Sequence, residues 1–208
     1  MVIAVQVLVV CRIAGAQLAR FYDLPSFGVG GGVESKVPDA EAAAEAMQTI
    51  LMVGLAGMTL CQSLGTLSFG MYGSPEMAVI CDEMVHMVKR ILAGFTVDED
   101  TMAVDVIRQV GHGGNYLDVD HTVRYFRKEL FFPSLFRRYS IDEWVKAGSK
   151  SIDQVAHGKV LSILEKATPV DLPPGADAEL ERALQRALAS RPAFPPAPLR
   201  RWLRWLSA

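Results

Sequence analysis

The chain has 208 residues, of which 50% are hydrophobic and 21% charged, so a sizeable core is expected and extensive disorder is not. A net charge of −2 and a pI near 6.1 argue against a nucleic-acid or anionic-membrane footprint. The three cysteines, Cys11, Cys61 and Cys81, are odd in number and form no C-x-x-C. They argue against a disulfide framework or zinc knuckle and indicate a reducing cytoplasm.

The chain opens with an apolar stretch, residues 1–10. It is too short to span a bilayer, which needs about 20 apolar residues, and it lacks the features of a signal peptide. A buried strand or helix is expected, and its abrupt start suggests a missing upstream element. Residues 11–22 are predicted to be helical, Pro25 ends that helix, and residues 26–29 form a short strand.

Two helices with clear caps follow the glycine-rich sequence GVGGGVESKVPD at residues 28–39. Asp39 is a good N-cap for an alanine-rich helix over 40–52, and a short strand is expected near 58–60. Ser74, with a proline after it, opens the clearest helix of the chain. Its apolar positions recur at helical spacing as Met77, Ile80, Met84, Val88, Ile91 and Leu92, before Gly94.

Several shorter helices are predicted in the second half of the chain. Asp98 caps one that Gly111 ends, and residues 121–130 form another. Two capping boxes, S-x-x-E at 140–143 and S-x-x-Q at 151–154, predict two closing helices. The final LRRWLRWL could be a membrane-surface or partner-docking helix, but the prolines just upstream favour a poorly ordered tail.

The alternation of strands and helices through residue 93 indicates an α/β fold, yet it supplies only two or three βα units. A complete eightfold barrel needs about 200–250 residues for its repeats. We therefore predict a partial TIM-type (β/α)8 barrel whose last few βα units occupy residues 1–135. A helical C-terminal cap follows over 136–168, and a Pro-rich, basic-amphipathic tail over 169–208.

The glycine-rich stretch raises the question of what approaches its backbone. A dinucleotide-binding G-x-G-x-x-G is disfavoured, because Val33 replaces the third glycine and the helix cap comes six residues later. The glycines could instead allow the backbone to turn tightly at the rim of a barrel. They could also belong to a loop at the carboxyl end of a strand, where α/β barrels place their chemistry. Glu34, Ser35 and Lys36 lie on that loop, and Glu34 and Lys36 could form an ion pair.

Two polar clusters have ordinary structural explanations. Asp82, Glu83, His86 and Lys89 suit the solvated face of a helix. The sequence GHGGNYLDVDHT at 111–122 contains metal-ligand residue types, but its spacing matches no zinc pattern, and a helix end followed by a turn explains most of it. No metal site is predicted. The corrinoid-binding signature D-x-H-x-x-G is also absent.

Four segments together carry a family resemblance: AQLARFYDLPSFGVGGGVESKVPDAEAA, EMAVICDEMVHMVKRILAGFTVDEDTMAVDVIRQVG, GGNYLDVDHT and SIDEWVKAG. Over roughly residues 12–168, in one consistent order, the chain resembles the C-terminal part of the trimethylamine/glycine betaine:corrinoid methyltransferase family. Members of that family are α/β barrels of more than twice this length. The resemblance thus implies that the first half of the barrel is lacking here.

The resemblance implies methyl transfer from a methylated amine to the Co(I) corrinoid of a separate partner protein, with no cofactor bound directly by this chain. Trimethylamine enzymes of the family carry pyrrolysine, which we place near 31–33, where this chain has ordinary residues. That departure favours a quaternary, glycine-betaine-like amine. A cytoplasmic homo-oligomer with no nucleic-acid or membrane partner is expected. The alternative is an inactive half-barrel that serves only as an assembly or binding module.

No catalytic residue is assigned from the sequence. The predicted substrate-binding residues on the first glycine loop are Gly30, Gly31, Gly32, Glu34, Ser35 and Lys36. Second choices are Asp82, Glu83, His112, Asn115 and His121. Glu34 and Tyr116 are predicted to face a cationic methyl group, because carboxylates and aromatic rings attract such cations.

Overall fold

The computed structural model describes residues 5–168 and 173–189. The predicted tail segment LRRWLRWL lies outside them. The chain divides into two units, Met1–Lys166 and Ala167–Ala208, which are taken separately below. In the second unit, the charged stretch after the Pro-Pro-Gly forms helix α9 (Ala176–Ala189), and Gly175 before it has a φ of +87°.

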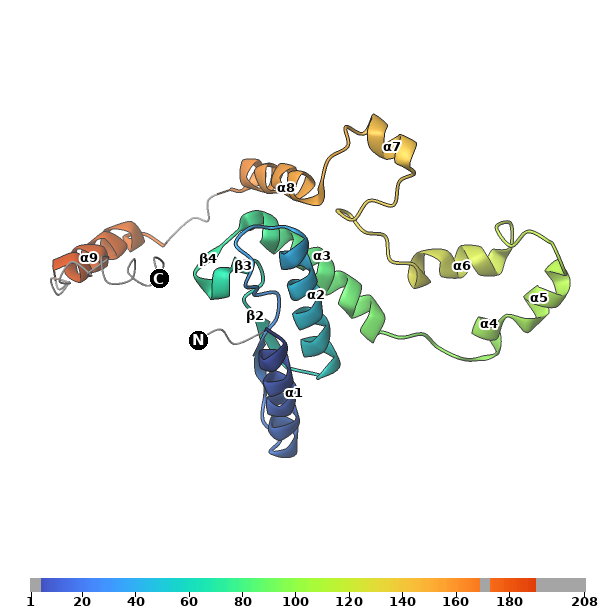
Figure 1. The fold of residues 1–208 in the computed structure, drawn as a ribbon, viewed down its shortest axis with the longest axis horizontal. Coiled ribbons are helices and arrows are strands. Elements are labelled where there is room, and N and C mark those ends of the chain that lie inside the picture. The colour runs from blue at the N-terminus through green and yellow to red at the C-terminus, as the bar shows by residue number, and fades with distance from the viewer. Residues whose placement is uncertain (1–4, 169–172, 190–208) are drawn as a thin grey trace, which may run out of the picture. The chain divides into compact units, whose positions relative to one another are not determined.

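In the first unit, helix α1 is followed by a β-α-β arrangement (Figure 1). Its elements are α1 (Val5–Phe21), β1 (Phe27–Val29), α2 (Ala40–Leu55) and β2 (Leu60–Gln62). β1 and β2 are parallel, with Gly28 opposite Cys61. Residues 5–10 of the apolar stretch and the predicted helix after it form one continuous helix, because neither a proline nor a turn sequence separates them.

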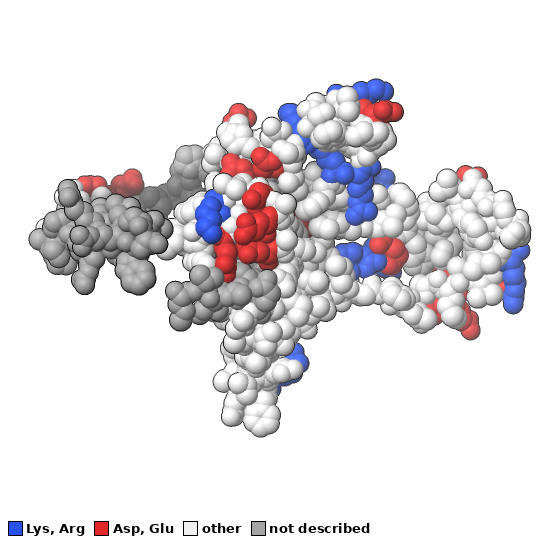
Figure 2. All heavy atoms as spheres, viewed as in Figure 1, with Lys and Arg blue, Asp and Glu red and all other residues white. Residues whose placement is uncertain are grey.

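Helix α2 begins where its cap was predicted. The Asp39 side chain accepts a hydrogen bond from the backbone N–H of Ala42 at 3.0 Å. The helix runs three residues beyond the predicted end and stops at Leu55, before Gly57 with its φ of +66°. Acidic side chains gather where α2 and α3 begin (Figure 2), and Glu41 in the first turn of α2 suits the positive end of the helix dipole.

A small antiparallel hairpin follows β2 and was not predicted. It consists of β3 (Thr66–Leu67), the 3-10 turn η1 (Ser68–Gly70) and β4 (Tyr72–Gly73). Three successive residues at its tip have positive φ: Ser68 at 50°, Phe69 at 58° and Gly70 at 78°. This conformation is unfavourable for the two non-glycine residues, so tertiary contacts must hold the tip in place.

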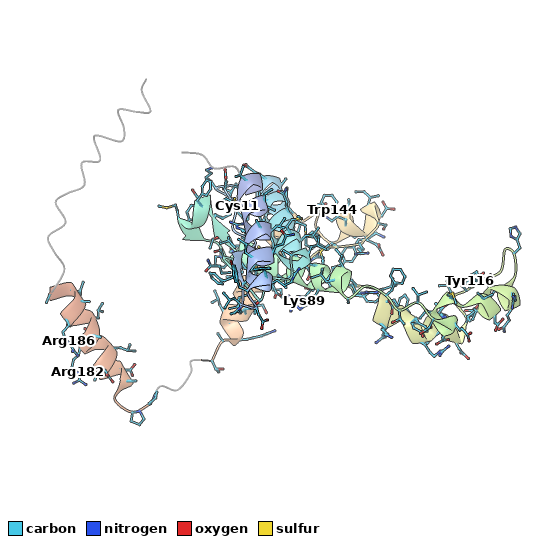
Figure 3. The ribbon with its side chains drawn as sticks, turned by 90° about the horizontal axis from the view of Figure 1, so that it is seen from below. Cys11, Lys89, Tyr116, Trp144, Arg182 and Arg186 are labelled. Atoms are coloured by element: carbon cyan, nitrogen blue, oxygen red, sulfur yellow. The ribbon has the colours of Figure 1, made fainter. Side chains whose placement is uncertain are left out.

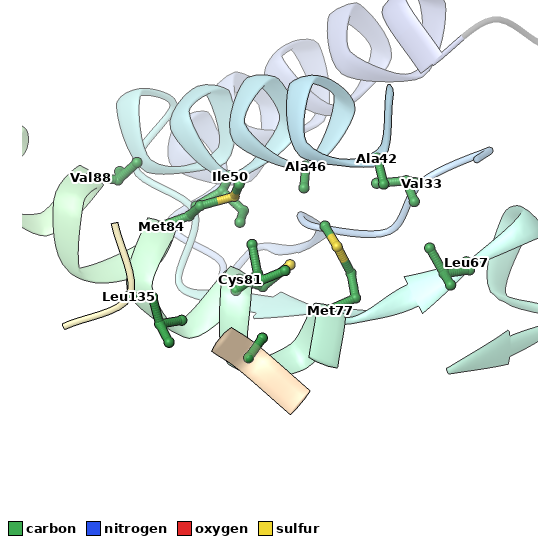
Figure 4. Packing of buried hydrophobic residues seen from close by; sticks show 12 residues of the cluster. Val33, Ala42, Ala46, Ile50, Leu67, Met77, Cys81, Met84, Val88 and Leu135 are labelled. Atoms are coloured by element: carbon green, nitrogen blue, oxygen red, sulfur yellow. The ribbon is translucent and has the colours of Figure 1, made fainter. Parts of the chain in front are cut away.

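Helix α3 (Pro75–Leu92) is the centre of the first unit. The Ser74 hydroxyl accepts from the backbone N–H of Met77 at 3.1 Å, as the predicted cap requires. Side chains of α2 and α3 interdigitate in the core (Figure 4). The buried cluster comprises Val33, Ala42, Ala46, Ile50, Leu67, Met77, Ile80, Cys81, Met84, Val88, Leu135 and Ala156.

Helix α8 (Ile152–Lys166) packs on the other side of α3 through Ala156 and Val160. Its His157 lies 2.9 Å, Nδ1 to Oε1, from Glu76 in the first turn of α3. The hydrogen bond from His157 is the main reason that the pKa of Glu76 is lowered to about 2. One half of the predicted second capping box is present, since the Ser151 N–H donates to the Gln154 side chain at 3.1 Å.

Four short helices connect α3 to α8. They are α4 (Glu99–Met102), α5 (Val104–Val110), α6 (Asp120–Glu129) and α7 (Ile141–Lys146). The single helix expected after Asp98 is wrong, because Ala103 takes a left-handed φ of 51° and separates α4 from α5. The capping box at Ser140 is confirmed. None of the residues of these four helices, all of which the structure describes, is buried.

The first unit is a mixed α/β structure, mostly helical, with two small two-stranded sheets. The parallel β1-α2-β2 unit confirms the βα pattern. Such a unit occurs both in barrels and in open α/β sheets, so the partial TIM barrel stays a prediction. Among the described residues, no helix is both long and apolar enough to cross a lipid bilayer.

Candidate functional site

The glycine loop leaves the carboxyl end of β1 and is bonded to its surroundings through its backbone. Gly30 N–H donates to the carbonyl of Gln62 at 3.1 Å, and Val33 N–H donates to that of Thr66 at 3.1 Å. Between them, Gly31 N–H donates to the buried hydroxyl of Thr49 on α2 at 2.9 Å. These amides are therefore engaged within the protein and are not directed at a ligand.

The structure shows what lies close to the glycines. A Cβ on Gly30 would lie 2.7 Å from the sulfur of Cys61. A Cβ on Gly31, whose φ is +80°, would lie 2.9 Å from a methyl carbon of Leu64 and 3.2 Å from the sulfur of Cys81. A side chain at either position would force a neighbour to shift, and at Gly31 the positive φ adds backbone strain. The close neighbours are the protein's own side chains, from β2, from the segment after it and from α3.

The second half of the loop is held by Glu45 of α2. One carboxylate oxygen accepts from the N–H of Glu34 at 2.7 Å and from that of Ser35 at 3.3 Å. Ser35 is 1% exposed, and its hydroxyl donates to the carbonyl of Val37 and to the carboxylate of Asp39. Ser35 therefore supports the start of α2, and its hydroxyl is occupied by that task.

A pocket of about 170 Å³ opens at the carboxyl ends of β1 and β2. Three segments line it: α1, the glycine loop after β1, and the segment after β2. Its lining residues are Leu8, Arg12, Val29, Gly32, Val33, Glu34, Ser63, Thr66, Phe69 and Gly70. The carboxyl ends of parallel strands are the usual place for binding sites in α/β proteins. Of the predicted site residues, Gly32 and Glu34 line this pocket.

The pocket contains two opposite charges. One carboxylate oxygen of Glu34, Oε1, is buried and has no hydrogen-bond partner among the described residues. The guanidinium of Arg12 donates from Nη1 to the carbonyl of Val29 at 2.8 Å. Burial lowers the pKa of Arg12 from its ordinary value. Buried polar atoms are almost always paired, so the unpaired oxygen of Glu34 is an exception among the residues that line this pocket.

Lys36 and the cysteines are not suited to chemistry in this pocket. Lys36 is exposed and, in the part of the chain that is described, makes no ion pair with Glu34; its carbonyl accepts from the Tyr72 hydroxyl. Burial raises the pKa of Cys61, and it raises that of Cys81 to about 11. At neutral pH both sulfurs are protonated thiols and poor nucleophiles.

Glu83 lies on α3 and is engaged elsewhere. Its carboxylate, 6% exposed, accepts from Leu135 N–H at 2.7 Å, Phe136 N–H at 3.2 Å and the Ser134 hydroxyl at 2.7 Å. Burial alone would raise the pKa of Glu83, but these hydrogen bonds outweigh it and the pKa is lowered. The neighbouring Asp82 is exposed, and its Oδ1 lies 3.8 Å from Nδ1 of His86.

Of the predicted residues around the second glycine loop, His112, Asn115 and Tyr116 lie between α5 and α6, and His121 lies in the first turn of α6; Figure 3 labels Tyr116. His112 and Tyr116 are exposed, and the Asn115 side chain accepts from Leu117 N–H at 3.0 Å. His121 Nε2 lies 2.7 Å from the carbonyl oxygen of Asp100. Within residues 5–168 and 173–189, no hydrogen bond or ion pair joins this cluster to the pocket, and no three His, Cys, Asp or Glu side chains form a metal site.

Sequence reasoning missed the other lining residues of the pocket, and two of them are polar or aromatic side chains of interest. Arg12 lies on α1 and Phe69 lies at the hairpin tip, each far in sequence from the glycine loop. Arg12 does carry one signal, because it is the sole charged residue among the first 19. Phe69 carries none, since the hairpin itself was not predicted.

A helix-connected pair of parallel strands, with a pocket at their carboxyl ends, defines the described part of the chain as an α/β protein. Comparison with known proteins is more specific. The family model described as trimethylamine methyltransferase (MTTB) matches residues 7–192. The chain therefore belongs to the trimethylamine methyltransferase family, as the sequence resemblance indicated.

Three relatives illustrate the similarity. Trimethylamine methyltransferase MttB of Desulfitobacterium hafniense (strain DSM 10664 / DCB-2) is 39% identical over 158 residues, which cover 76% of this chain and 32% of that protein. Glycine betaine methyltransferase of Desulfitobacterium hafniense (strain Y51) is 37% identical over 179 residues, 86% and 36% of the two chains. Trimethylamine methyltransferase MttB of Methanosarcina barkeri is 39% identical over 163 residues, which cover 76% of this chain and 32% of that protein. The chain thus spans about a third of the length of these relatives.

Proposed function

We propose that the chain takes part in methyl transfer from a methylated amine, of quaternary and glycine-betaine-like type, to the corrinoid of a partner protein. Family membership and the relatives named above support a methylated amine as the donor. The observation that carries the proposal is Glu34, which lines the pocket at the strand ends and has a buried carboxylate oxygen, Oε1, without a hydrogen-bond partner among the described residues. A quaternary ammonium ion carries a positive charge and has no N–H to donate, and both a carboxylate such as Glu34 and an aromatic ring such as that of Phe69, which line the pocket, attract such a cation.

The reaction sets clear requirements for this chain. The N–CH3 bond breaks with its electron pair going to nitrogen, so the donor must be cationic to leave as a neutral amine. The pocket residues would hold that cation in one orientation and keep water away from it. The corrinoid of the partner would supply Co(I), a strong nucleophile, as the methyl acceptor. A pocket of about 170 Å³ accommodates a small amine but not a corrinoid ring, which is consistent with an acceptor carried by another protein.

The test is a reconstitution with the corrinoid partner reduced to Co(I). The cobalt absorption spectrum is followed after adding each of a panel of quaternary amines, with this chain and with a version as long as its relatives. We expect the methylated-cobalt spectrum to appear, and Glu34→Gln to slow its appearance. Glu41→Gln, an exposed carboxylate on α2, serves as the matched control. A flat spectrum across the panel with the longer version would refute the proposal.

A second candidate function, assembly without catalysis, is favoured by one observation. Phe27 and Leu60 are opposite each other in the parallel pair, and each is 60% exposed. Parallel sheets are normally covered on both faces, so this exposed face is suited to packing against another polypeptide. Size-exclusion chromatography and thermal melting of the chain test this role. A cooperative melt of a monomer would contradict it, whereas aggregation or homo-oligomers would support an interface at this face.

A further inference from the structure

We propose that the outward-facing apolar side of helix α6 is a docking surface for a second copy of this chain, with the two α6 helices packed antiparallel. The helix spans Asp120–Glu129 and is labelled in Figure 1. Three apolar side chains form a row on this side, Val123, Phe126 and Leu130, and this row is called the α6 stripe below. The inference is independent of the proposed methyl transfer, because none of the three lines the pocket at the strand ends.

Polar contacts determine which side of α6 faces the rest of the first unit. The Tyr125 hydroxyl donates to the Asp100 carboxylate of α4 at 2.7 Å, and the Arg124 guanidinium donates to the same carboxylate at 3.1 Å and 3.3 Å. At the end of the helix, Arg90 of α3 donates from Nε to the carbonyl of Glu129 at 3.0 Å. An amphipathic helix normally turns its apolar side towards the core. Here the polar side is attached to the protein, and the apolar side is directed outward.

The α6 stripe is a contiguous exposed apolar surface. Its residues recur at intervals of three and four, so they lie along one side of the helix. Val123 is 68% exposed, Phe126 45% and Leu130 52%. Phe132, 58% exposed, extends the surface, because its ring centroid lies 5.3 Å from that of Phe126. Exposed apolar surfaces of this kind are typical of sites that contact another protein.

Two charges at the border of the α6 stripe favour a second copy as the occupant. Asp120 is three residues before Val123 and Arg127 is four residues after it, so both lie on the same border of the stripe. Both are exposed, and among the described residues neither side chain forms a hydrogen bond or an ion pair. In an antiparallel pair related by a twofold axis, the same borders of the two helices meet with their directions reversed. Asp120 of each copy then lies beside Arg127 of the other, so the surface is complementary to itself.

The size of this surface predicts a weak dimer. The four apolar side chains, each about half exposed, present about 400 Å² per copy, whereas a standard stable interface buries about 800 Å² per partner. Association should therefore depend on concentration. The two pairs of exposed charges contribute little to the affinity and mainly determine the relative orientation of the helices.

The first test is sedimentation velocity of the full chain between about 10 µM and about 1 mM. We expect monomers at the lower concentration and a dimer at the higher one, as a small interface predicts. Val123→Glu places a charge in the α6 stripe and should abolish the dimer. Val145→Glu is the matched control, because Val145 is also a helical valine, on α7, and is 57% exposed. It should leave the dimer unchanged.

The second test exchanges the two border charges. Asp120→Arg places two arginines opposite each other at both contacts, and Arg127→Asp places two aspartates there, so each variant alone should be monomeric. Mixed in equal amounts, the two variants should form a heterodimer in which both contacts again join opposite charges. Asp142→Arg and Lys146→Asp make a comparable change on α7, where both residues are exposed, and should not affect the dimer.

Circular dichroism establishes that each variant folds, and Val123→Ser replaces Val123→Glu if the latter does not. A chain that stays monomeric up to about 1 mM overturns the inference. A dimer that survives substitution of Val123 also overturns it, because such a dimer must use another surface, such as the one that exposes Phe27 and Leu60. A mixture of the two charge variants that remains monomeric excludes the antiparallel pair. The α6 stripe would then fit a different partner or another part of a longer polypeptide.

Discussion

Glu83 is predicted to be the strongest single attachment between α3 and the segment at residues 134–136. Its carboxylate accepts three hydrogen bonds, two from backbone amides and one from a hydroxyl, and it is 6% exposed. Glu83→Ala removes the acceptor for all three donors. The consequence depends on which of these donors water can reach after the substitution.

The magnitude follows from the exposure of the donors. Leu135 is 3% exposed, so its N–H stays buried and unpaired, which costs about 2 kcal/mol. Ser134 is exposed and Phe136 half-buried, so their donors can be hydrated, and their loss adds about 1 kcal/mol. The expected decrease in the free energy of unfolding is therefore about 3 kcal/mol. Glu83→Gln keeps one acceptor oxygen and should lose about half as much.

Urea unfolding of the full chain measures these losses. Asp82→Ala is the matched control, since Asp82 is next in sequence, carries the same charge and has a side chain that is 70% exposed. Its loss should stay below about 0.5 kcal/mol. Limited proteolysis should also cut Glu83→Ala first within 134–136. A loss for Glu83→Ala within about 1 kcal/mol of the control would show that the segment is not held by this carboxylate.

Three further predictions concern glycine, acid and thiol chemistry. Gly31→Ala should lower the free energy of unfolding by about 2 kcal/mol, whereas Gly158→Ala, at an open position of α8, should raise it by about 0.5 kcal/mol; equal changes in urea unfolding would contradict this. The pKa of Glu76 is lowered from 4.5 to about 2, mainly by the hydrogen bond from His157, so the ionised carboxylate stabilises the fold above pH 4.5 and this stabilisation is lost as the pH falls towards 2. Glu76→Gln should therefore make the free energy of unfolding depend less on pH between 4.5 and 2. The exposed Cys11 should react with a maleimide at neutral pH, while the buried Cys81, with its pKa near 11, should react only on unfolding; mass spectrometry of native protein labelled at Cys81 would refute this.

The parts of the fold that could be predicted are those determined by neighbouring residues. Ser74, Asp39 and Ser140 each cap a helix through a hydrogen bond to a residue three positions ahead, and each cap is confirmed. The hairpin after β2 could not be predicted in this way. Its tip is held by bonds from Ser68 and Phe69 to a loop more than 30 residues earlier, and no local pattern records such contacts.

The residues of the candidate site also differ in whether neighbouring sequence identifies them. Glu34 could be predicted because the glycines before it mark a loop at the end of a strand. Arg12 and Phe69 could not, because they join the pocket only when α1 and the hairpin fold back onto that loop. The residues around the second glycine loop were predicted as site residues because they are close in sequence, but closeness in sequence did not bring them to the pocket. Among these histidines and acids, His121 is directed to a carbonyl of α4.

The glycine loop argues against one kind of ligand. Loops that bind phosphate present free backbone amides, but here the amides of Gly30, Gly31 and Val33 are bonded to the protein itself. The glycines bring the loop close to the segment after β2 and to α3, and this leaves the Glu34 carboxylate at the pocket. Because the amides of Gly30, Gly31 and Val33 already have acceptors within the protein, they have no free N–H for a phosphate. The case against a phosphate-binding loop therefore follows from the hydrogen bonds of this loop, independently of the family to which the chain belongs.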